Sequence, residues 1–273
     1  MILSYQASGR GALPHHMRFC IRREIDFINT EERLKKVQGI PIEIAFPRNL
    51  SHFLKHHHAL LEIRKLLRRF TIAVRSVHAP HGSLAAPDFR TWASIVIGFA
   101  EAVDAEMVVF HPETSQQENR QEEQTAALYN INREQERTTV RISLETLREK
   151  DRILTPDEIM KHQLTMVLDT SLIPKTEITW IVESYHSCVS NIHLSAVSSG
   201  DEQQACARQF RPVDSDPFCL DILDRLHELG WNGLITLEYL PWLSTKSMED
   251  RLLLERIYQY NQAAVNDTSR WIQ

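Results

Sequence analysis

The chain has 273 residues, of which 42% are hydrophobic and 25% are charged, proportions that are ordinary for a soluble globular protein. Its formal charge of −5 and pI near 6.2 provide no general basic field, so a nucleic acid or anionic membrane partner is not expected. Four scattered cysteines without a C-x-x-C pair fit reduced thiols, and there is no signal peptide pattern or bilayer-long apolar run. We therefore expect a soluble, cytoplasmic protein.

Eight short stretches rich in β-branched residues recur along the chain. In chain order, the predicted strands are Ile2–Tyr5, Ile40–Phe46, Thr71–His78, Met107–His111, Thr139–Glu145, Thr165–Asp169, Val189–Leu194 and Gly233–Glu238. Apolar residues at helical spacing predict helices at Leu54–Phe70, Trp92–Val103 and Phe218–Leu229, and the polar stretch 115–137 is expected to form an exposed helix.

This alternation of strands and helices predicts βαβ units and a parallel sheet. Eight such units in a chain of this length indicate an α/β fold with a single (β/α)8 TIM barrel domain over residues 1–273. No G-x-G-x-x-G motif follows the first strand, which removes the usual dinucleotide-binding interpretation.

The third to eighth predicted strands each end in a side chain that can bind a metal ion or transfer a proton. These side chains are His78, His111, Glu145, Asp169, His193 and Glu238. In a TIM barrel the carboxyl ends of all strands open on one face, so these residues should converge. Crowded carboxylates repel each other unless a cation lies between them, and carboxylate with imidazole suits Mn²⁺, Zn²⁺, Fe²⁺ or Mg²⁺. The pattern favours a divalent metal site.

Each residue taken alone also has a structural interpretation. A single histidine beside a strand is more often a hydrogen-bonded core residue, and Asp169 could cap the following helix. Three weaker candidates for substrate binding lie in loops. Arg208 and Arg211, after the seventh strand, could bind phosphate or carboxylate or could be solvent-exposed, and His81 could reach the mouth or cap a loop.

The motifs VHAP, VFHPE, SLET, VLDTS, IHLS and LITLEY occur in this order at βα spacing. This series, which covers nearly the whole chain, resembles the xylose isomerase-like TIM-barrel superfamily. That group includes sugar and sugar-phosphate isomerases and epimerases and AP endonucleases of the endonuclease IV type. The resemblance implies a divalent metal held by Glu145, Asp169, His193 and Glu238.

The two branches of this superfamily imply different chemistry at the mouth. In the epimerase branch, Glu145 and Glu238 would be the acid–base pair. In the endonuclease branch, His78 and His111 would join Glu145 to hold a second metal.

The sequence departs from both branches. Position 172 is leucine where histidine is expected, and the loop after the seventh strand has no D-x-H pair for a third metal. Ser199 stands where an arginine often follows the strand-seven histidine. These departures argue against trinuclear phosphodiester cleavage and leave the substrate open.

The leading hypothesis is a divalent-metal-dependent isomerase or epimerase of a sugar, sugar phosphate or related polyhydroxylated small molecule. The first alternative is a mono- or dinuclear metal-dependent phosphodiesterase or hydrolase related to AP endonucleases. The second is a non-catalytic barrel with a vestigial metal site. The sequence leaves the oligomeric state open.

Overall fold

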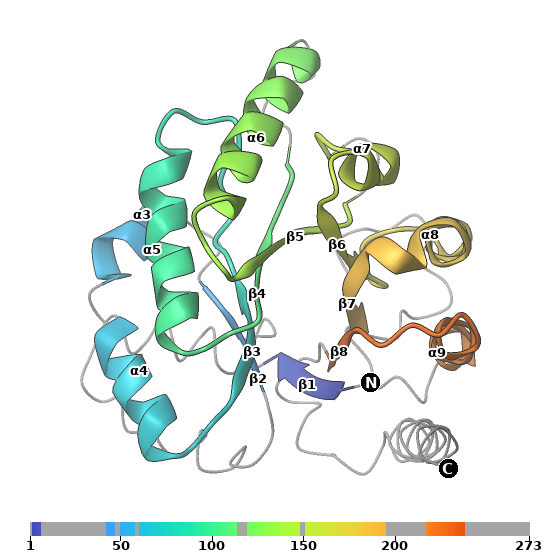
Figure 1. The fold of residues 1–273 in the computed structure, drawn as a ribbon, viewed down its shortest axis with the longest axis horizontal. Helices are drawn as coiled ribbons and strands as arrows, with labels where there is room; N and C mark the ends of the chain where they lie inside the picture. Colours follow the sequence, from blue (N-terminus) through green and yellow to red (C-terminus); the bar gives the residue numbers. More distant parts are fainter. Residues whose placement is uncertain are drawn as a thin grey trace, which may run out of the picture.

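Eight parallel strands pair in chain order and close into a barrel in the computed structural model (Figure 1). The structure describes residues 2–6, 42–46, 50–57, 60–113, 119–147, 151–194 and 217–237. The strands are β1 (Ile2–Gln6), β2 (Ile42–Ala45), β3 (Val74–His78), β4 (Met107–Phe110), β5 (Arg141–Glu145), β6 (Thr165–Asp169), β7 (Val189–Leu194) and β8 (Leu234–Leu237). Because β1 pairs with both β2 and β8, the sheet has no free edge. The predicted TIM barrel is therefore confirmed, whereas its extent as one domain over the whole chain stays a prediction.

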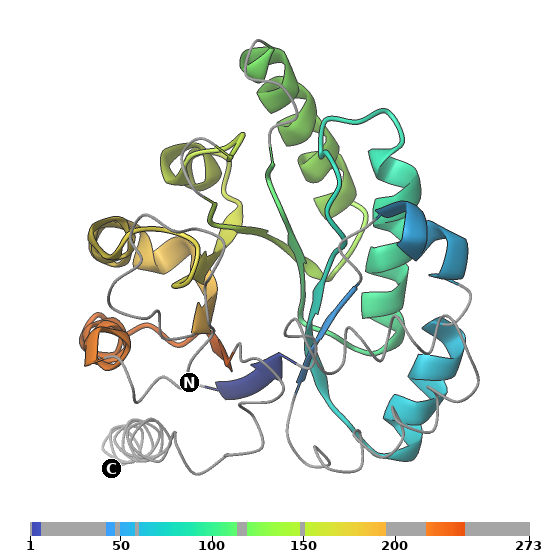
Figure 2. The same cartoon turned by 180° about the vertical axis from the view of Figure 1, so that it is seen from behind.

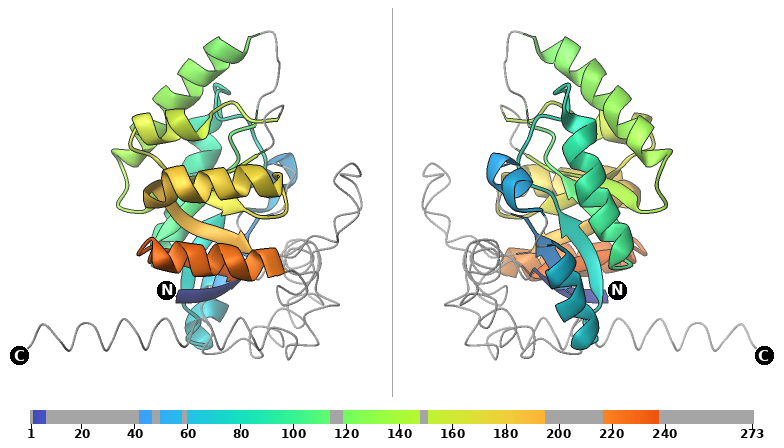
Figure 3. Two further views of the ribbon diagram at one scale, coloured as in Figure 1. Left: turned by 90° about the vertical axis from the view of Figure 1, so that its right-hand side faces the viewer. Right: turned by 90° about the vertical axis from the view of Figure 1, so that its left-hand side faces the viewer.

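Helices surround the barrel. They are α3 (Leu50–His56), α4 (Leu60–Arg69), α5 (Phe89–Ala102), α6 (Arg120–Gln135), α7 (Pro156–Lys161), α8 (Lys175–Tyr185) and α9 (Pro217–Glu228), with a short 3₁₀ helix, η2 (His186–Cys188). In Figure 1, α3 to α5 lie on the side of β2 to β4, and α7 to α9 lie on the side of β6 to β8; Figure 2 shows the same layers from behind. The side views show α8 and α9 side by side, and these two helices contact each other (Figure 3). Within the described residues, no helix is long and apolar enough to cross a membrane.

Each observed strand overlaps its predicted range, and the ends differ by at most three residues. Three predicted helices correspond to α5, α6 and α9. The single helix predicted over Leu54–Phe70 is wrong, because α3 ends at His56 and α4 begins at Leu60. Nδ1 of His57 lies 2.7 Å from the carbonyl oxygen of Leu54, so the imidazole satisfies a carbonyl that the last turn of α3 leaves open. Beyond the interruption, the buried Ile63 and Leu67 keep the helical spacing that the sequence indicated.

Successive side chains along each strand point alternately outward, into a core shared with the helices, and inward, into the barrel interior. Residues such as Val108 and Phe110 belong to the large apolar core that includes the helix residues Phe89 and Trp92. The intervening residues face the interior, where four apolar side chains form a separate cluster: Met107, Val109, Val167 and Leu234. We call this cluster the apolar floor. Continuing the same alternation by two residues brings His111 and Asp169 to the interior, just beyond the floor.

The turn into β8 is held by a tight contact between Trp231 and Gly233. The indole Nε1 of Trp231 donates to the carbonyl oxygen of Val189 at 2.6 Å, which ties this turn to the start of β7. A Cβ atom on Gly233 would lie 2.3 Å from Cζ2 of Trp231 and 2.7 Å from the carbonyl oxygen of Ser190. Glycine is therefore required here by close approach.

We expect Gly233→Ala to destabilise the protein by roughly 1–3 kcal/mol, because the backbone or Trp231 must move to admit the methyl group. Gly98→Ala is the matched control: in α5 a Cβ atom at Gly98 meets no atom within 4 Å, and alanine should stabilise the helix by roughly 0.5–1 kcal/mol. Urea unfolding of both variants measures whether each substitution lowers or raises the free energy of unfolding. Equal stability of Gly233→Ala and the parent protein would contradict the close-packing argument.

Candidate metal centre

Five of the six predicted strand-end side chains lie together at the carboxyl ends of β3 to β7. They are His78, His111, Glu145, Asp169 and His193, which we call the strand-end cluster. The register of the sheet brings them together, since Asp169 pairs directly with His193 across β6 and β7. All five residues are buried, with at most 8% of their surface exposed. The convergence expected from the fold is therefore observed, while the chemical role of each residue stays a prediction.

Glu145 lies at the centre of the cluster and contacts three imidazoles. Its Oε1 is 3.0 Å from Nδ1 of His193 and 3.3 Å from Nε2 of His78, and its Oε2 is 2.8 Å from Nε2 of His111. Burial alone raises the pKa of this carboxyl. Electrostatic attraction to the His111 and His78 imidazoles and the hydrogen bonds from His111 and His193 outweigh burial and hold the pKa of Glu145 well below its ordinary value. Glu145 is therefore a carboxylate at neutral pH.

Asp169 has both roles that its sequence position suggested. Its Oδ1 accepts a hydrogen bond from the backbone N–H of Ser171 at 2.6 Å, which is the local turn interaction. A carboxylate oxygen of the same residue also lies within 4.8 Å of ligand atoms of Glu145 and His193. Burial and the negative charge of Glu145 raise the pKa of Asp169 to about 6. Two buried acids are thus crowded together.

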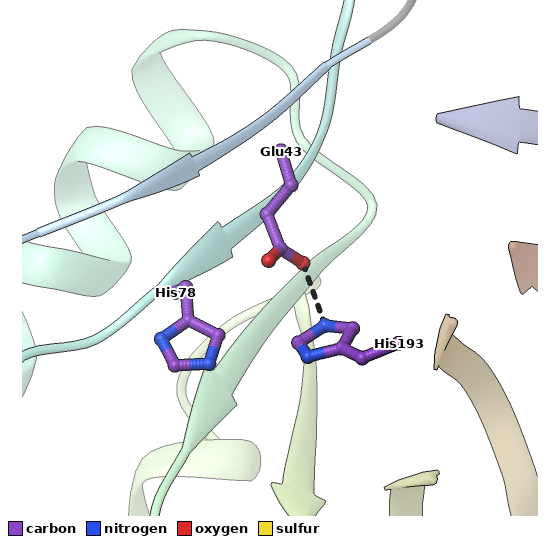
Figure 4. A group of neighbouring side chains, drawn as sticks. All are labelled: Glu43, His78 and His193. Carbon is purple, nitrogen blue, oxygen red and sulfur yellow. Dashed lines mark hydrogen bonds and ion pairs between the residues drawn. The ribbon is translucent and has the colours of Figure 1, made fainter. Parts of the chain in front are cut away.

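Glu43 in β2 is a member of this site that the sequence analysis did not select. It is fully buried, its Oε2 accepts a hydrogen bond from Oγ of Ser76 at 2.6 Å, and the same oxygen lies 3.2 Å from Nε2 of His193. Figure 4 shows Glu43 and His193 pointing toward each other, with His78 beside them. The signal was a charged residue between Ile42 and Ile44 in an otherwise apolar strand. Its position in the middle of a strand, and not at the strand end, gave no sign that it would meet the other acids.

The pKa values of Glu43 and His193 are shifted in opposite directions, so that both side chains are charged. Burial raises the pKa of Glu43, but the charge of His193 and its hydrogen bond outweigh this and lower it to about 2. Burial likewise lowers the pKa of His193, yet the two glutamates that contact it hold this pKa well above its ordinary value. One imidazolium between two carboxylates balances part of the buried negative charge.

His111 and His81 form the rim of the site beside β4. Burial lowers the pKa of His111 to about 4, so its imidazole is neutral at pH 7, the form that binds metals. Its Nδ1 is buried without a hydrogen-bond partner among the described residues. His81 is partly buried, its ring stacks on His111 at 3.8 Å between centroids, and its Nδ1 lies 2.7 Å from Oε1 of Glu113. The structure thus places His81 at the edge of the cluster.

The donor atoms fit one or more divalent cations. Three groups of three residues each offer ligand atoms within 4.8 Å of one another: Glu43, His78 and His193; His78, His111 and Glu145; Glu145, Asp169 and His193. Carboxylate oxygens with imidazole nitrogens are ligands for Mn²⁺, Zn²⁺ or Fe²⁺, and the acids alone would also suit Mg²⁺. A cation near Asp169 would offset the repulsion that raises the pKa of this acid.

Several predicted residues lie outside the described part of the chain. They are Glu238, Arg208, Arg211 and Ser199. Their predicted roles stay predictions. Leu172 is described: it is partly buried and packs against the outer apolar core, so an apolar side chain occupies the position where the resemblance led us to expect histidine.

A cavity of about 650 Å³ lies at the opposite end of the barrel. Its lining includes residues at the amino-terminal ends of β4 to β8, such as Met107, Thr165 and Leu234, and none of the strand-end cluster. In this fold the chemistry is built at the carboxyl ends of the strands, so the strand-end cluster, and not this cavity, is the candidate functional site.

No family model and no curated protein sequence matches the chain. Solved structures do resemble it. A xylose isomerase domain containing protein from Salmonella typhimurium superposes with a TM-score of 0.64 at 14% identity, covering 96% of this chain and 97% of the other. The 3-keto-D-glucoside 4-epimerase YcjR from E. coli, in its apo form, gives 0.62 at 10% identity over 94% and 99%.

An AP endonuclease of family 2 from Brucella melitensis gives a TM-score of 0.57 at 13% identity, covering 88% of this chain and 93% of the other. The resemblance to the xylose isomerase-like TIM-barrel group is therefore confirmed at the level of the fold. Both branches expected from the sequence motifs, an epimerase and an AP endonuclease, occur among these similar structures.

The raised pKa of Asp169 predicts how the metal-free protein responds to pH. Between about pH 4 and pH 6 the unfolded chain ionises Asp169 while the folded protein keeps it protonated, so folding stability falls as pH rises through this window. Above pH 6 the penalty is constant and on the order of 3 kcal/mol, a figure that already includes the attraction of His193. We expect Asp169→Asn to stabilise the EDTA-treated protein by roughly 1–3 kcal/mol near pH 7.5, and by less near pH 5.

Urea unfolding in EDTA at the two pH values measures this difference. In the presence of Mn²⁺ the order should reverse, because only the parent protein keeps the Asp169 ligand and gains stability from the ion. An Asp169→Asn variant less stable than the parent at both pH values in EDTA would refute the inference that ionised Asp169 destabilises the metal-free protein.

Proposed function

We propose that the protein is a divalent-metal-dependent isomerase or epimerase of a sugar, sugar phosphate or related polyhydroxylated small molecule. The observation that carries this proposal is the buried group of Glu145, Asp169 and His193, whose ligand atoms lie within 4.8 Å of one another. The group lies at the carboxyl ends of the strands, where TIM-barrel enzymes have their active sites. A solved structure with the same fold is a 3-keto-D-glucoside 4-epimerase.

In this proposal Glu145, Asp169, His193 and Glu238 hold the ion. When bound, a divalent cation polarises adjacent substrate oxygens and stabilises negative charge that develops beside the reacting carbon. Glu145 is a carboxylate at neutral pH, so one of the two glutamates can remove a proton from a carbon next to a carbonyl. The other glutamate returns a proton to the opposite face or to the neighbouring carbon, which gives epimerisation or isomerisation respectively.

The neutral histidine at the rim has a separate task in this proposal. His111 keeps an uncharged ring at pH 7 and has a buried Nδ1 atom without a partner among the described residues. Because Nε2 of the uncharged ring donates to Glu145, Nδ1 can accept a hydrogen bond from a substrate hydroxyl group without placing a cation beside the divalent ion. The substrate hydroxyl would supply the missing hydrogen bond.

A second candidate function is supported by the group of His78, His111 and Glu145. With a second cation there, Glu145 would bridge two ions, and the site would resemble the dinuclear centres that hydrolyse phosphate esters. A bridging Glu145 would not be available as a base, so the two functions are mutually exclusive uses of one carboxylate. The missing third-metal ligands and the net charge of −5 count against a DNA substrate.

Metal content distinguishes the two functions. After loading with Mn²⁺ and removal of free ion, we expect about one ion per chain for the isomerase and about two for the hydrolase. His111→Ala should leave the single ion of the isomerase in place but reduce a dinuclear site from two ions to one. His81→Ala is the matched control, since His81 lies on the rim and in none of the three metal groups. A parent protein that retains no ion would support the vestigial barrel.

The acid–base role is tested at Glu238. We expect Glu238→Gln to lower turnover at least about 100-fold on whichever keto-sugar, ketose or sugar phosphate the parent accepts, because glutamine cannot transfer the proton. The measurement is exchange of substrate C–H hydrogen with D₂O, followed by NMR. Glu228→Gln, at an exposed glutamate of α9, is the control and should keep the parent rate. Full exchange activity in Glu238→Gln would remove the glutamate pair from the mechanism.

A further inference from the structure

Glu43 is a buried acid of the barrel interior that the proposed chemistry leaves unused. It lies inside β2 and pairs with Ser76 of β3, so it is two residues deeper in the barrel than the level at which Ala45 pairs with His78. Its side chain has no exposed surface. A carboxylate kept at this depth is costly unless it makes strong polar contacts, and two of them are to Ser76 and His193.

The two ring nitrogens of His193 face different acids. Nδ1 lies 3.0 Å from Oε1 of Glu145, on the side of the Glu145–Asp169–His193 group, and Nε2 lies 3.2 Å from Oε2 of Glu43 (Figure 4). His193 is fully buried, so its ring cannot turn toward water. Metal-binding histidines usually donate their second ring N–H to a carboxylate, which fixes the tautomer and the orientation of the ring.

Ser76 holds the acid in turn. Its hydroxyl donates to Oε2, the same oxygen that faces His193, at 2.6 Å. The hydroxyl therefore orients the Glu43 carboxylate, and the carboxylate orients the imidazole. This chain of contacts connects β2, β3 and β7 through the barrel interior.

We propose that Glu43 is a positioning residue that keeps a proton on Nε2 of His193, so that the ring releases its Nδ1 proton to solvent when Nδ1 binds the cation. Glu43 is then not itself a ligand, although it belongs to one of the three metal groups. This inference rests on the proposed metal-dependent function. It adds the nitrogen through which His193 binds, and a residue that controls the affinity of the site without touching the ion.

The test compares three variants of the full chain by Mn²⁺ titration and by histidine-selective ¹⁵N NMR. Glu43→Leu removes the acceptor and should weaken Mn²⁺ binding about 10- to 100-fold. Glu43→Gln keeps a neutral acceptor of the same length and should weaken it less, so it also serves if the leucine variant does not fold. Thr236→Val is the matched control: it removes a buried hydrogen bond to Asn191 in the same barrel interior and should leave the affinity unchanged.

The NMR readout separates orientation from simple loss of stability. In the Zn²⁺-loaded parent protein, we expect the His193 signals of a metal-bound Nδ1 and a protonated, downfield-shifted Nε2–H. In Glu43→Leu the Nε2–H proton should lose this downfield shift. A metal-bound Nε2, or parent-like Mn²⁺ affinity in a folded Glu43→Leu variant, would overturn the proposal.

The same experiments distinguish failure of the metal-dependent function from failure of the positioning role of Glu43. If the parent protein binds no ion, the metal-dependent function fails. The Nε2–H signal of the metal-free protein then still decides the positioning role: it should be downfield-shifted in the parent and in Thr236→Val and lost in Glu43→Leu. A Nε2–H signal that is the same in the parent and in Glu43→Leu would reject the Glu43–His193 pairing itself.

Discussion

The burial of one carboxylate among three imidazoles is the interaction on which this site depends. Glu145 is nearly inaccessible, and an ionised acid at such depth is stable only with partners of opposite charge or strong donors. Its partners His78, His111 and His193 come from β3, β4 and β7. A slip of one residue in any of these strands would turn a histidine outward, so the chemistry of the site and the register of the barrel constrain each other.

Much of the fold could be predicted because the sequence shows short β-branched apolar runs that end in a polar residue and alternate with helical patterns. Runs such as Met107–His111 carry an apolar outer face and a polar last residue, and the predicted strand ends agree with the structure to within three residues. The interruption between α3 and α4 could not be predicted from apolar spacing, since the spacing continues across it. At the end of α3 the structure shows a contact between the His57 imidazole and the Leu54 carbonyl oxygen, which the spacing does not reveal.

The candidate site was predictable in membership but not in arrangement. The sequence selected the strand-end residues as a set, yet it could not show that Glu145 uses both oxygens or that His193 faces two acids. Glu43 could not be predicted as part of the site, because the sequence does not show at which level of the barrel a mid-strand residue lies until the register with the neighbouring strands is known. The two sequence interpretations of Asp169 also proved compatible, because one carboxyl group can accept the Ser171 N–H and still lie beside Glu145.

The sharing of residues among the three metal groups limits the order in which they can fill. A neutral imidazole has a single lone pair, and the two nitrogens of His193 face separate groups, one containing Glu43 and one containing Asp169. Cations in both groups at once would require an imidazolate bridge, with His193 losing both ring protons, which is disfavoured near pH 7. An ion bound to Nδ1 in the Asp169 group therefore leaves the Glu43 group without a free His193 nitrogen. This exclusion agrees with the role of Glu43 as a positioning residue and not a ligand.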